Sequence, residues 1–475
     1  MTFSPKPNSG LNLTPNSDLV EEAKNIVEQD FPSKIASLGQ LVRIPGIAWD
    51  AFDPEDLERS AEAVAELFRN TGIFEAVEIK RASFEGKPGA PAVLASRKAK
   101  NGKPHVLLYA HHDVQPPGDD NLWESPAFEP TARDGRIFGR GAADDKAGVI
   151  AHLSALEVLK KVAGDDFDLG ISIFVEGEEE AGSRTFRPFL DENKEKLAAD
   201  AIIVADSMNW SPEVPALTVS LRGVVSLEFE VRTLEHAVHS GMFGGAIPDA
   251  MMPMVRILAS LHDDSGNVAV QGLASYSFAD LPYTEENLRQ DSSLLPSVTQ
   301  IGDDSLMTRL WGKSALTVIG IDAPSVATSS NTLLPKVGAK VSLRIAPGQD
   351  PEQALEALKA HILANTPFGA EVIFGETDKG KAFMAETSGW AAELMTESLS
   401  KAFGSQAVEI GIGGSIPFIA DLTEVFPNAQ ILVTGVEDAD SRAHSPNESI
   451  HLLGLKNAMV AEAVFLLGCN QLESN

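Results

Sequence analysis

Five short stretches of the sequence carry residue types that bind divalent metals. Each holds a histidine or a carboxylate and is predicted to follow an apolar run typical of a buried strand. In an open α/β sheet, ligands bind just beyond the carboxyl ends of the strands, so stretches far apart in sequence can converge on one cleft. Two histidines and three carboxylates suit two divalent ions that share a bridging ligand and a water molecule. The stretches are Ala110–Asp113, Ala143–Lys146, Glu178–Gly182, Ala205–Ser207 and Arg442–Ser445.

Taken singly, these stretches have simpler structural explanations. A histidine at a strand end, such as His111, is more often a satisfied structural residue than a ligand. The pair Asp144-Asp145 precedes a predicted helix and would cap it. The three glutamates from Glu178 to Glu180 would usually form a solvated loop. The prediction of a dinuclear centre depends on all five stretches reaching strand ends together.

The spacing within the stretches suggests which residues bind metal, which support a ligand and which transfer protons. Asp113 lies two residues after His111, on the same side of the pleat, where a carboxylate can accept the second ring N–H and fix the tautomer. Of the adjacent Glu179 and Glu180, one can bind metal while the other moves protons with a raised pKa. A bridging Asp144 needs a rigid support, and the glycine-rich approach from Gly139 suits close backbone packing.

The elements that must position these residues alternate between strand and helix. Continuous apolar strands between helices indicate a parallel sheet covered on both faces. The predicted strands are 105–110, 170–175, 201–205 and 430–433, and the predicted helices are 18–41, 55–69, 146–162, 388–403 and one from Ile450.

The pattern changes near Pro212. An alternating strand at 221–231 is followed by a helix at 247–262, strands at 316–321 and 340–345, a helix at 351–365 and a strand at 370–374. This order, β-α-β-β-α-β, is typical of a ferredoxin-like unit. Residues 263–313 form a polar insertion with mixed signals and no predicted structure.

The fold class predicted is therefore α/β. A mostly parallel-sheet, discontinuous catalytic domain (1–215 and 383–475) is interrupted by a ferredoxin-like α+β lid and dimerisation domain (216–382).

Composition narrows the class of protein. The 475 residues include 43% hydrophobic and 22% charged residues, which is typical of a soluble protein with sizeable cores. The net charge of −30 disfavours binding to nucleic acid or to anionic membranes. A single cysteine, Cys469, excludes an internal disulfide and a thiolate metal cage. A cytoplasmic location is the simplest expectation, because the sequence shows neither an apolar signal-peptide core nor an unbroken membrane span.

Four longer motifs resemble those of the co-catalytic zinc peptidases that include carnosinase, cytosolic non-specific dipeptidase, aminoacylase and succinyl-diaminopimelate desuccinylase. The resemblance covers nearly the whole chain and is strongest to the dipeptidase branch. The motifs are Tyr109-Ala-His-His-Asp-Val-Gln-Pro116, Gly139-Arg-Gly-Ala-Ala-Asp-Asp-Lys146, His239-Ser-Gly-Met-Phe-Gly-Gly245 and Gly413-Gly-Ser-Ile-Pro417.

The resemblance implies roles for individual residues. His111 and Asp206 would hold one ion, Glu180 and His444 the other, and Asp144 would bridge them. Glu179 resembles the general base, and Asp113 the residue that orients His111. His239 matches a lid histidine that reaches into the partner subunit's site and steadies the oxyanion. Arg344 matches a lid arginine that grips the substrate carboxylate, and Ser415 and Asn331 match further substrate contacts.

Two details concern the stretch around Asp144. The Asp144–Asp145 peptide is expected to be cis, as in relatives. Ala147 departs from the family, which usually has glycine after Asp-Asp-Lys, and we expect a small packing change there.

The activity predicted is hydrolysis of dipeptides or short peptides with a free carboxylate. It would use two divalent ions, zinc first, with manganese and cobalt also compatible with the oxygen-rich ligands. The expected partners are a small peptide substrate and a second copy of the chain, with no nucleic acid and no membrane.

An N-acyl-amino-acid deacylase would use the same ligands with a differently shaped pocket, and a non-catalytic binding protein on this fold is a weaker alternative because no ligand or base is missing. A serine hydrolase is disfavoured, because the sequence around Ser415 lacks the final glycine of a nucleophile elbow.

Overall fold

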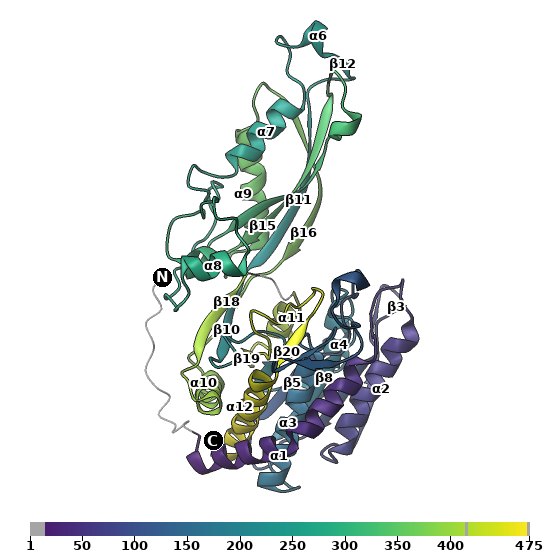
Figure 1. The fold of residues 1–475 in the computed structure, drawn as a ribbon, viewed down its shortest axis with the longest axis vertical. Helices are drawn as coiled ribbons and strands as arrows, with labels where there is room; N and C mark the ends of the chain where they lie inside the picture. Colours follow the sequence, from purple (N-terminus) through teal and green to yellow (C-terminus); the bar gives the residue numbers. More distant parts are fainter. Residues whose placement is uncertain (1–14, 414–416, 473–475) are drawn as a thin grey trace. The chain divides into compact units, whose positions relative to one another are not determined.

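The computed structural model describes residues 15–413 and 417–472, which fall into two compact units. The larger unit contains the described residues up to Val219, those from Ala385 to Ile410 and those from Pro417 onward. The smaller unit contains Ser220–Met384 and a short segment that begins at Gly411. Figure 1 shows that the chain passes from the α/β elements of the larger unit into the smaller unit, which has a sheet and helices of its own, and then returns.

A mixed sheet of nine strands contains the central strands of the larger unit, in the order β1-β4-β8-β5-β9-β19-β10-β17, with β18 paired to β10. Of these strands, β17 lies among the residues of the smaller unit. The strands are β1 (Val77–Lys80), β4 (Ala92–Arg97), β5 (His105–His111), β8 (Gly170–Glu176), β9 (Ala201–Val204), β10 (Ala216–Leu221), β17 (Phe383–Met384), β18 (Val408–Ile412) and β19 (Gln430–Val433).

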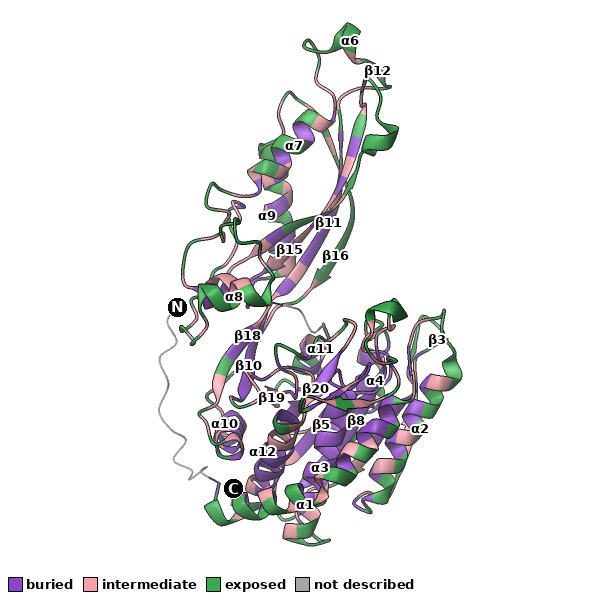
Figure 2. Cartoon of the chain, viewed as in Figure 1, coloured by how far each residue is buried: buried purple, intermediate pink, exposed green. Residues whose placement is uncertain are grey.

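The prediction of a mostly parallel sheet is right for the centre of this sheet and wrong for its flanks. Only β8, β5, β9 and β19 are mutually parallel. On one side β4 and β1 run antiparallel, and on the other β10 and β17 do so. Antiparallel edges on a parallel centre are common in large sheets. The central strands were the predictable ones because they are buried along nearly their whole length, as Figure 2 shows for β5 and β8.

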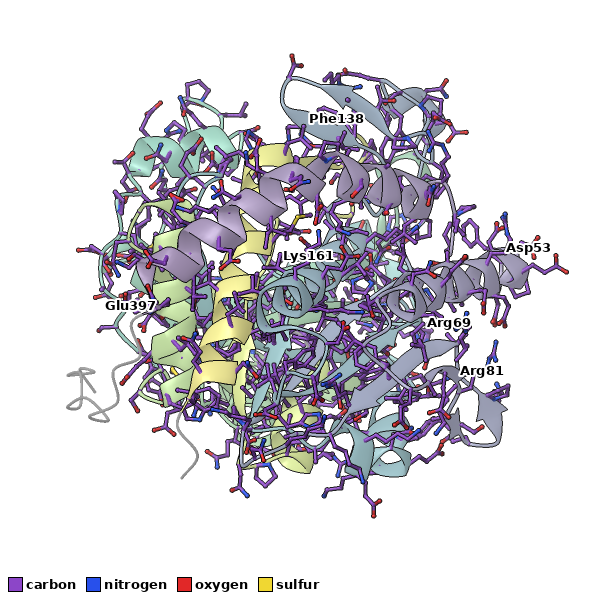
Figure 3. All side chains as sticks on the ribbon, turned by 90° about the horizontal axis from the view of Figure 1, so that it is seen from below. Asp53, Arg69, Arg81, Phe138, Lys161 and Glu397 are labelled. Carbon is purple, nitrogen blue, oxygen red and sulfur yellow. The ribbon has the colours of Figure 1, made fainter. Side chains whose placement is uncertain are left out.

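Helices cover the central strands of this sheet. Tyr109 on β5 packs against Phe186 of α4 and Phe418 of α11, while α3 contacts the same strand. The side chain of Asp53 caps the start of helix α2, whose first residue is a proline, and Arg69 lies in its last turn. Figure 3 labels both residues. The helices are α1 (Ser17–Val42), α2 (Pro54–Asn70), α3 (Lys146–Ala163), α4 (Phe186–Glu192), α5 (Lys194–Leu197), α10 (Trp390–Phe403), α11 (Pro417–Val425) and α12 (Leu452–Gln471).

Helix α12 is the one described helix that is long and apolar enough to span a membrane by length and composition. Its most apolar stretch is 67% buried, and it packs on α3, α10 and α1. A core helix of this kind passes the same test, so this is weak evidence for a membrane span.

Two small sheets complete the larger unit. One is the hairpin β2 (Ser83–Phe84) and β3 (Lys87–Pro88). The other has the order β20-β7-β6, from β6 (Thr131–Arg133), β7 (Arg136–Phe138) and β20 (Ser449–His451). Phe138, labelled in Figure 3, lies on this second sheet, which we call the small sheet.

The smaller unit is a four-stranded antiparallel sheet with the order β13-β15-β11-β16. Helices α7 and α9 contact it, and its core lies between them and alternate strand residues such as Val225, Leu227 and Val341. The elements run β11 (Gly223–Arg232), α7 (Met251–Ser260), β13 (Ala315–Asp322), β15 (Lys336–Ile345), α9 (Pro351–Ala364) and β16 (Glu371–Gly380).

Two further features belong to this unit. A short ribbon joins β12 (Val238–His239) to β14 (Thr332–Leu333), with α6 (Ser240–Phe243) after β12. The insertion at 263–313 holds α8 (Glu285–Asp291), a π-helical turn (Thr308–Gly312) and irregular backbone.

Candidate metal centre

Six side chains of the larger unit form two groups that could each hold a metal ion. Ligand atoms of His111, Glu179 and Asp206 lie within 4.8 Å of one another, and so do those of Asp144, Glu180 and His444. Asp144 links the groups, because its Oδ1 lies 3.0 Å from Nε2 of His111 and its Oδ2 lies 3.0 Å from Nε2 of His444. A carboxylate that turns one oxygen to each group has the geometry of a bridge. Imidazole nitrogens and carboxylate oxygens at this spacing fit zinc, manganese or cobalt.

The first group is placed by the parallel centre of the large sheet. His111 is the last residue of β5 and is fully buried, and Asp206 follows β9 by two residues. Tyr109 on β5 pairs with Val204 on β9, so the two strands end side by side. The rule for strand ends in open α/β sheets therefore accounts for this pair.

The three glutamates of the acidic loop after β8 have different roles: one supports the structure and two lie at the candidate metal centre. Glu178 is buried, and its carboxylate accepts hydrogen bonds from the backbone of Ala90 and from Thr185. Glu179 and Glu180 point to the two metal-binding groups instead. This run is therefore not a solvated loop, because the carboxylate of its first residue is buried and bonded inside the protein.

Asp113 connects this loop to His111. Its two carboxylate oxygens accept the backbone N–H groups of Glu179 and Glu180, at 3.1 Å each. Its Oδ1 also lies 3.4 Å from Nδ1 of His111, and that ring nitrogen is 3.1 Å from the backbone oxygen of Asp113. The side chain thus supports both the histidine and the two glutamates.

Asp144 and His444 do not follow strands of the large sheet, contrary to the expectation for all five stretches. Asp144 lies between β7 and α3, next to a cis peptide bond to Asp145 that agrees with the prediction. His444 lies in the loop between β19 and β20 with φ +62°, a left-handed conformation that is uncommon for histidine. Both loops flank the small sheet, so polar loop contacts rather than apolar strands must position these two residues.

Hydrogen bonds to carboxylates favour the charged form of both histidines. Burial opposes a charge on His111, yet hydrogen bonds to Asp113 and Asp144 raise its pKa well above the ordinary value. Hydrogen bonds to Asp144 and Glu180 raise the pKa of His444 to about 11. The pKa of Asp144 is lowered despite burial, because both imidazoles bond to it. The carboxylates therefore favour positive charge at the positions between them. Divalent cations would supply more of this charge than the two protonated histidines do.

The remaining carboxylates are held close together and are half-buried. Burial raises the pKa of Asp206 to about 7. Burial, followed by repulsion from Asp206, raises the pKa of Glu179 well above its usual range. Glu437 behaves in the same way, through burial and its proximity to Asp144 and Asp206. Sequence reasoning missed Glu437, since nothing in its local pattern separates it from a surface glutamate.

Gln115 is a second residue at the centre that was not singled out. Its Nε2 donates a 2.7 Å hydrogen bond to Oε2 of Glu180. It belongs to the motif Tyr109–Pro116, and its position two residues after Asp113 was the available signal.

The residues predicted to contact substrate lie in the smaller unit, apart from Ser415, which falls outside the described residues. His239 and Asn331 come together, because β12 pairs with β14 and Ser240 N–H donates to the Asn331 carbonyl oxygen at 3.0 Å. His239 is exposed, and its Nδ1 accepts from Gly241 N–H.

Arg344 lies elsewhere in that unit. The ribbon with His239 is next to the Lys336 end of β15, and Arg344 is eight residues further along the strand. At about 3.4 Å per residue, roughly 27 Å of strand separates Lys336 from Arg344. Within one chain, therefore, His239 and Arg344 do not meet.

Ala147, the departure from the family pattern, lies directly before a glycine that the backbone requires. Ala147 is fully buried, whereas a Cβ at the next residue, Gly148, would lie 2.1 Å from Oδ1 of Asp145. Glycine is therefore required at 148, whereas the packing change expected at 147 stays a prediction.

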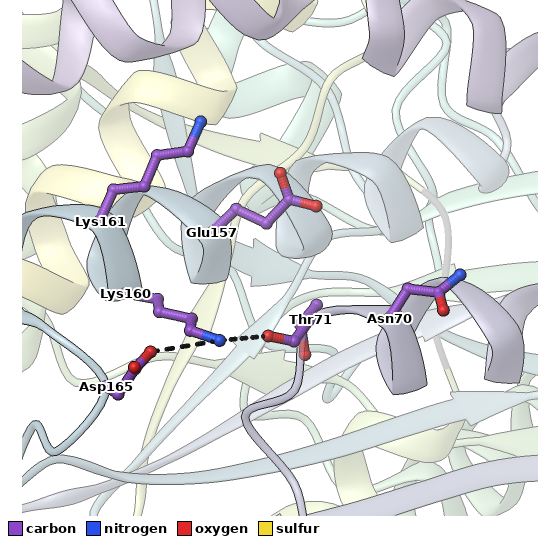
Figure 4. Close-up of a pocket in the computed structure, with 6 residues that line it drawn as sticks. All are labelled: Asn70, Thr71, Glu157, Lys160, Lys161 and Asp165. Atoms are coloured by element: carbon purple, nitrogen blue, oxygen red, sulfur yellow. Dashed lines mark hydrogen bonds and ion pairs between the residues drawn. The ribbon is translucent and has the colours of Figure 1, made fainter.

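One surface pocket contains none of these ligands. It has a volume of about 350 Å³ and lies between the end of α2 and α3 (Figure 4). Its two lysines already have partners within the chain. Lys160 pairs with Asp165 and the Thr71 carbonyl, and Lys161 pairs with Asp30. It offers no convergent set of reactive groups.

Comparisons with known proteins agree with the geometry. A cysteinylglycine-S-conjugate dipeptidase from Corynebacterium striatum is 34% identical to this chain over 383 residues, which cover 80% of the chain and 84% of the relative. A Beta-Ala-His dipeptidase from Rattus norvegicus is 26% identical over 97% of each chain. The crystal structure of human carnosine dipeptidase 1 shares the fold, with a TM-score of 0.75, 23% identity and coverage of 97% of this chain and 100% of that one.

The resemblance inferred from the motifs is confirmed at the level of the family. Residues 107–467, most of the chain and all six side chains of the two groups, match one family description. The sequence therefore belongs to peptidase family M20/M25/M40.

Proposed function

We propose that this protein hydrolyses dipeptides or short peptides with a free C-terminal carboxylate at a centre of two divalent metal ions. The observation that carries the proposal is the position of Asp144, which turns one oxygen to each of two histidines at 3.0 Å. Relatives with 34% and 26% identity are named as dipeptidases, which supports peptide hydrolysis as the reaction.

The metal ligands proposed are His111 and Asp206 for one ion, Glu180 and His444 for the other, and Asp144 for both. When bound, the two ions would lower the pKa of a shared water and polarise the scissile carbonyl. Zinc is the proposed metal, with manganese or cobalt as substitutes that the same donors would accept.

Glu179 is the proposed general base. Its carboxylate lies within 4.8 Å of ligand atoms of His111 and Asp206, so it can reach a water held there. Burial raises its pKa, which favours accepting a proton and returning it to the leaving amine, while bound cations would moderate this shift. Asp113 keeps the base in place by accepting its backbone N–H.

We further propose that the smaller unit is a lid that recognises the substrate and forms a homodimer. Arg344 would hold the peptide carboxylate with its planar fork. His239 would stabilise the oxyanion in the site of a second copy. The roughly 27 Å of strand between Lys336 and Arg344 supports this division between two chains, because one chain cannot bring both His239 and Arg344 to one small substrate. A cytoplasmic location is also proposed, in line with a single cysteine.

The test is an assay of the metal-loaded protein with a panel of dipeptides, run beside N-acetyl amino acids. Preferential cleavage of dipeptides is expected, and preferential deacylation would show that the deacylase alternative is correct. The Glu179→Gln variant should retain its metal, measured by elemental analysis, and lose at least about 100-fold in kcat. Full activity with metal retained would disprove the role of Glu179.

A further inference from the structure

We propose that Glu448 is a positioning residue that chiefly maintains the metal position formed by Asp144, Glu180 and His444. This inference rests on the proposed two-metal centre and assigns a role to a residue outside both ligand groups. Glu448 touches neither substrate nor metal; it acts by holding the backbone that carries two of the ligands.

Glu448 accepts four hydrogen bonds from the segment that leads to Asp144. Its Oε1 accepts the backbone N–H groups of Ala143 and Asp144, at 3.0 and 3.1 Å. Its Oε2 accepts from Nη1 of Arg140 at 2.6 Å and from the backbone N–H of Gly141 at 3.1 Å. One carboxylate thus organises the whole turn before the bridging aspartate.

This contact is isolated from water. The side chain of Glu448 is 0% exposed and that of Arg140 is 2% exposed. Removing one charge of such a buried pair leaves the other uncompensated, so the interaction resists loosening. A buried ion pair with additional backbone bonds is a rigid support, unlike a mobile surface pair.

Glu448 also ties the Asp144 segment to the His444 loop. It lies four residues after His444, and its carbonyl oxygen accepts the N–H of Gly139 at 2.9 Å. The next residues form β20, which pairs with β7 directly before Gly139. The distance between Asp144 and His444 therefore depends on Glu448 and the small sheet.

The other metal position shares Asp144 and a hydrogen bond from His111 N–H to Asp145, but its two remaining ligands are placed by strands. His111 and Asp206 are fixed by the ladder between β5 and β9, which Glu448 does not contact. Loss of the Glu448 carboxylate should accordingly weaken binding of the ion at Asp144, Glu180 and His444 more than binding of the other ion, because Glu448 supports two ligands of the first and only the shared Asp144 of the second. A residue with a purely structural role would lower stability without such a difference.

The experiment is a calorimetric titration of Zn²⁺ into the full-length protein after removal of metal by chelation. The wild type should bind two ions per chain. In Glu448→Gln, the amide group cannot accept from Arg140 or Gly141 at the same oxygen. One ion should therefore bind 10–100-fold more weakly than in wild type, and the other should lose less affinity. Thermal unfolding of the apoprotein is measured in parallel.

Two further variants keep the test decisive. Glu462→Gln is the matched control, because Glu462 is a buried carboxylate paired with His152 at 2.8 Å and lies outside the metal-binding loops. This variant should lower stability and leave the affinities for both Zn²⁺ ions unchanged. If Glu448→Gln does not fold, Glu448→Asp replaces it, since the shorter side chain keeps its charge but cannot reach both Arg140 and the Asp144 amide; the same selective weakening is expected.

Unchanged affinities in a destabilised Glu448 variant would overturn the proposed role, as would equal weakening of both ions. A wild-type chain that binds fewer than two ions would instead overturn the proposed centre, and with it this role.

Discussion

The two halves of the metal centre are built in different ways. His111 and Asp206 lie at the ends of adjacent parallel strands, β5 and β9, whose residues are almost all buried and apolar. Asp144 and His444 lie on loops beside the small sheet, held by buried ion pairs. Strand packing fixes a position through many weak contacts, whereas an ion pair concentrates the same task in two side chains. The first half should therefore depend less on these ion pairs than the second.

The largest expected effect comes from the residue shared by both halves. Asp144→Asn removes the charge that faces both histidines, and we expect kcat to fall by at least about 10³-fold, because the charge stabilisation supplied by a bridged metal pair is worth several kcal/mol. Bound metal should drop below two ions per chain by elemental analysis. Asp440→Asn, an exposed aspartate near His444, is the control and should remain fully active.

Stability should respond most in the strand-built half. Ile203 on β9 is fully buried, and Ile203→Ala should lower the free energy of unfolding by about 2–5 kcal/mol through the cavity it leaves. Metal affinity of the folded protein should stay the same, because the ladder still places Asp206. Ile203→Val, with an expected loss of about 0.5–1.5 kcal/mol, provides the graded control. A loss of metal affinity that follows the loss of stability would remove the distinction between the halves.

The loop-built half should show the reverse behaviour. Arg136 binds both carboxylate oxygens of Asp438 at 3.0 Å, six residues before His444. Asp438→Asn should lower the affinity for one ion by up to about tenfold, which is the low end for residues that support metal ligands. The melting temperature should change only modestly. Titration with Zn²⁺ measures the affinity. Equal weakening of both ions would show that this loop does not act on one position alone.

The smallest expected effect concerns pH. Although burial opposes charge on His152, its interaction with Glu462 raises the pKa of the imidazole above the ordinary value. A group whose pKa is higher in the folded protein stabilises the fold fully below its unfolded pKa, near 6.5, and this contribution is lost as pH rises through the folded pKa. Glu462→Gln should therefore cost about 1 kcal/mol below pH 6 and less at higher pH. Chemical denaturation at several pH values measures this, and a cost that grows with pH would contradict it.

The same contrast explains how much could be predicted from the sequence. Strands such as 105–110 and 170–175 are continuous apolar runs, so β5 and β8 were found to within a residue of their observed ends. The flanking strands β1 and β4 and the small sheet were missed, because they are short or partly exposed and depend on long-range pairing.

Within the centre, residue types and motifs predicted the side chains that the structure brings together in two groups. They did not predict the supporting contacts. Glu448 and Gln115 look like ordinary polar residues in sequence, and their significance follows from partners 304 and 65 positions away. Similarly, Glu178 could not be separated from Glu179 and Glu180 until its bonds to Ala90 and Thr185 were seen.

The length of β15 has a genetic consequence. With His239 near one end and Arg344 near the other, the proposed homodimer builds each site from two copies of the gene product. Chains carrying His239→Ala and chains carrying Arg344→Ala would each be inactive alone. Produced in one cell, they would form mixed dimers in which one site has lost both residues and the other has both intact. Two defective alleles would thus complement each other and restore about a quarter of the sites, whereas a self-sufficient chain would show no rescue.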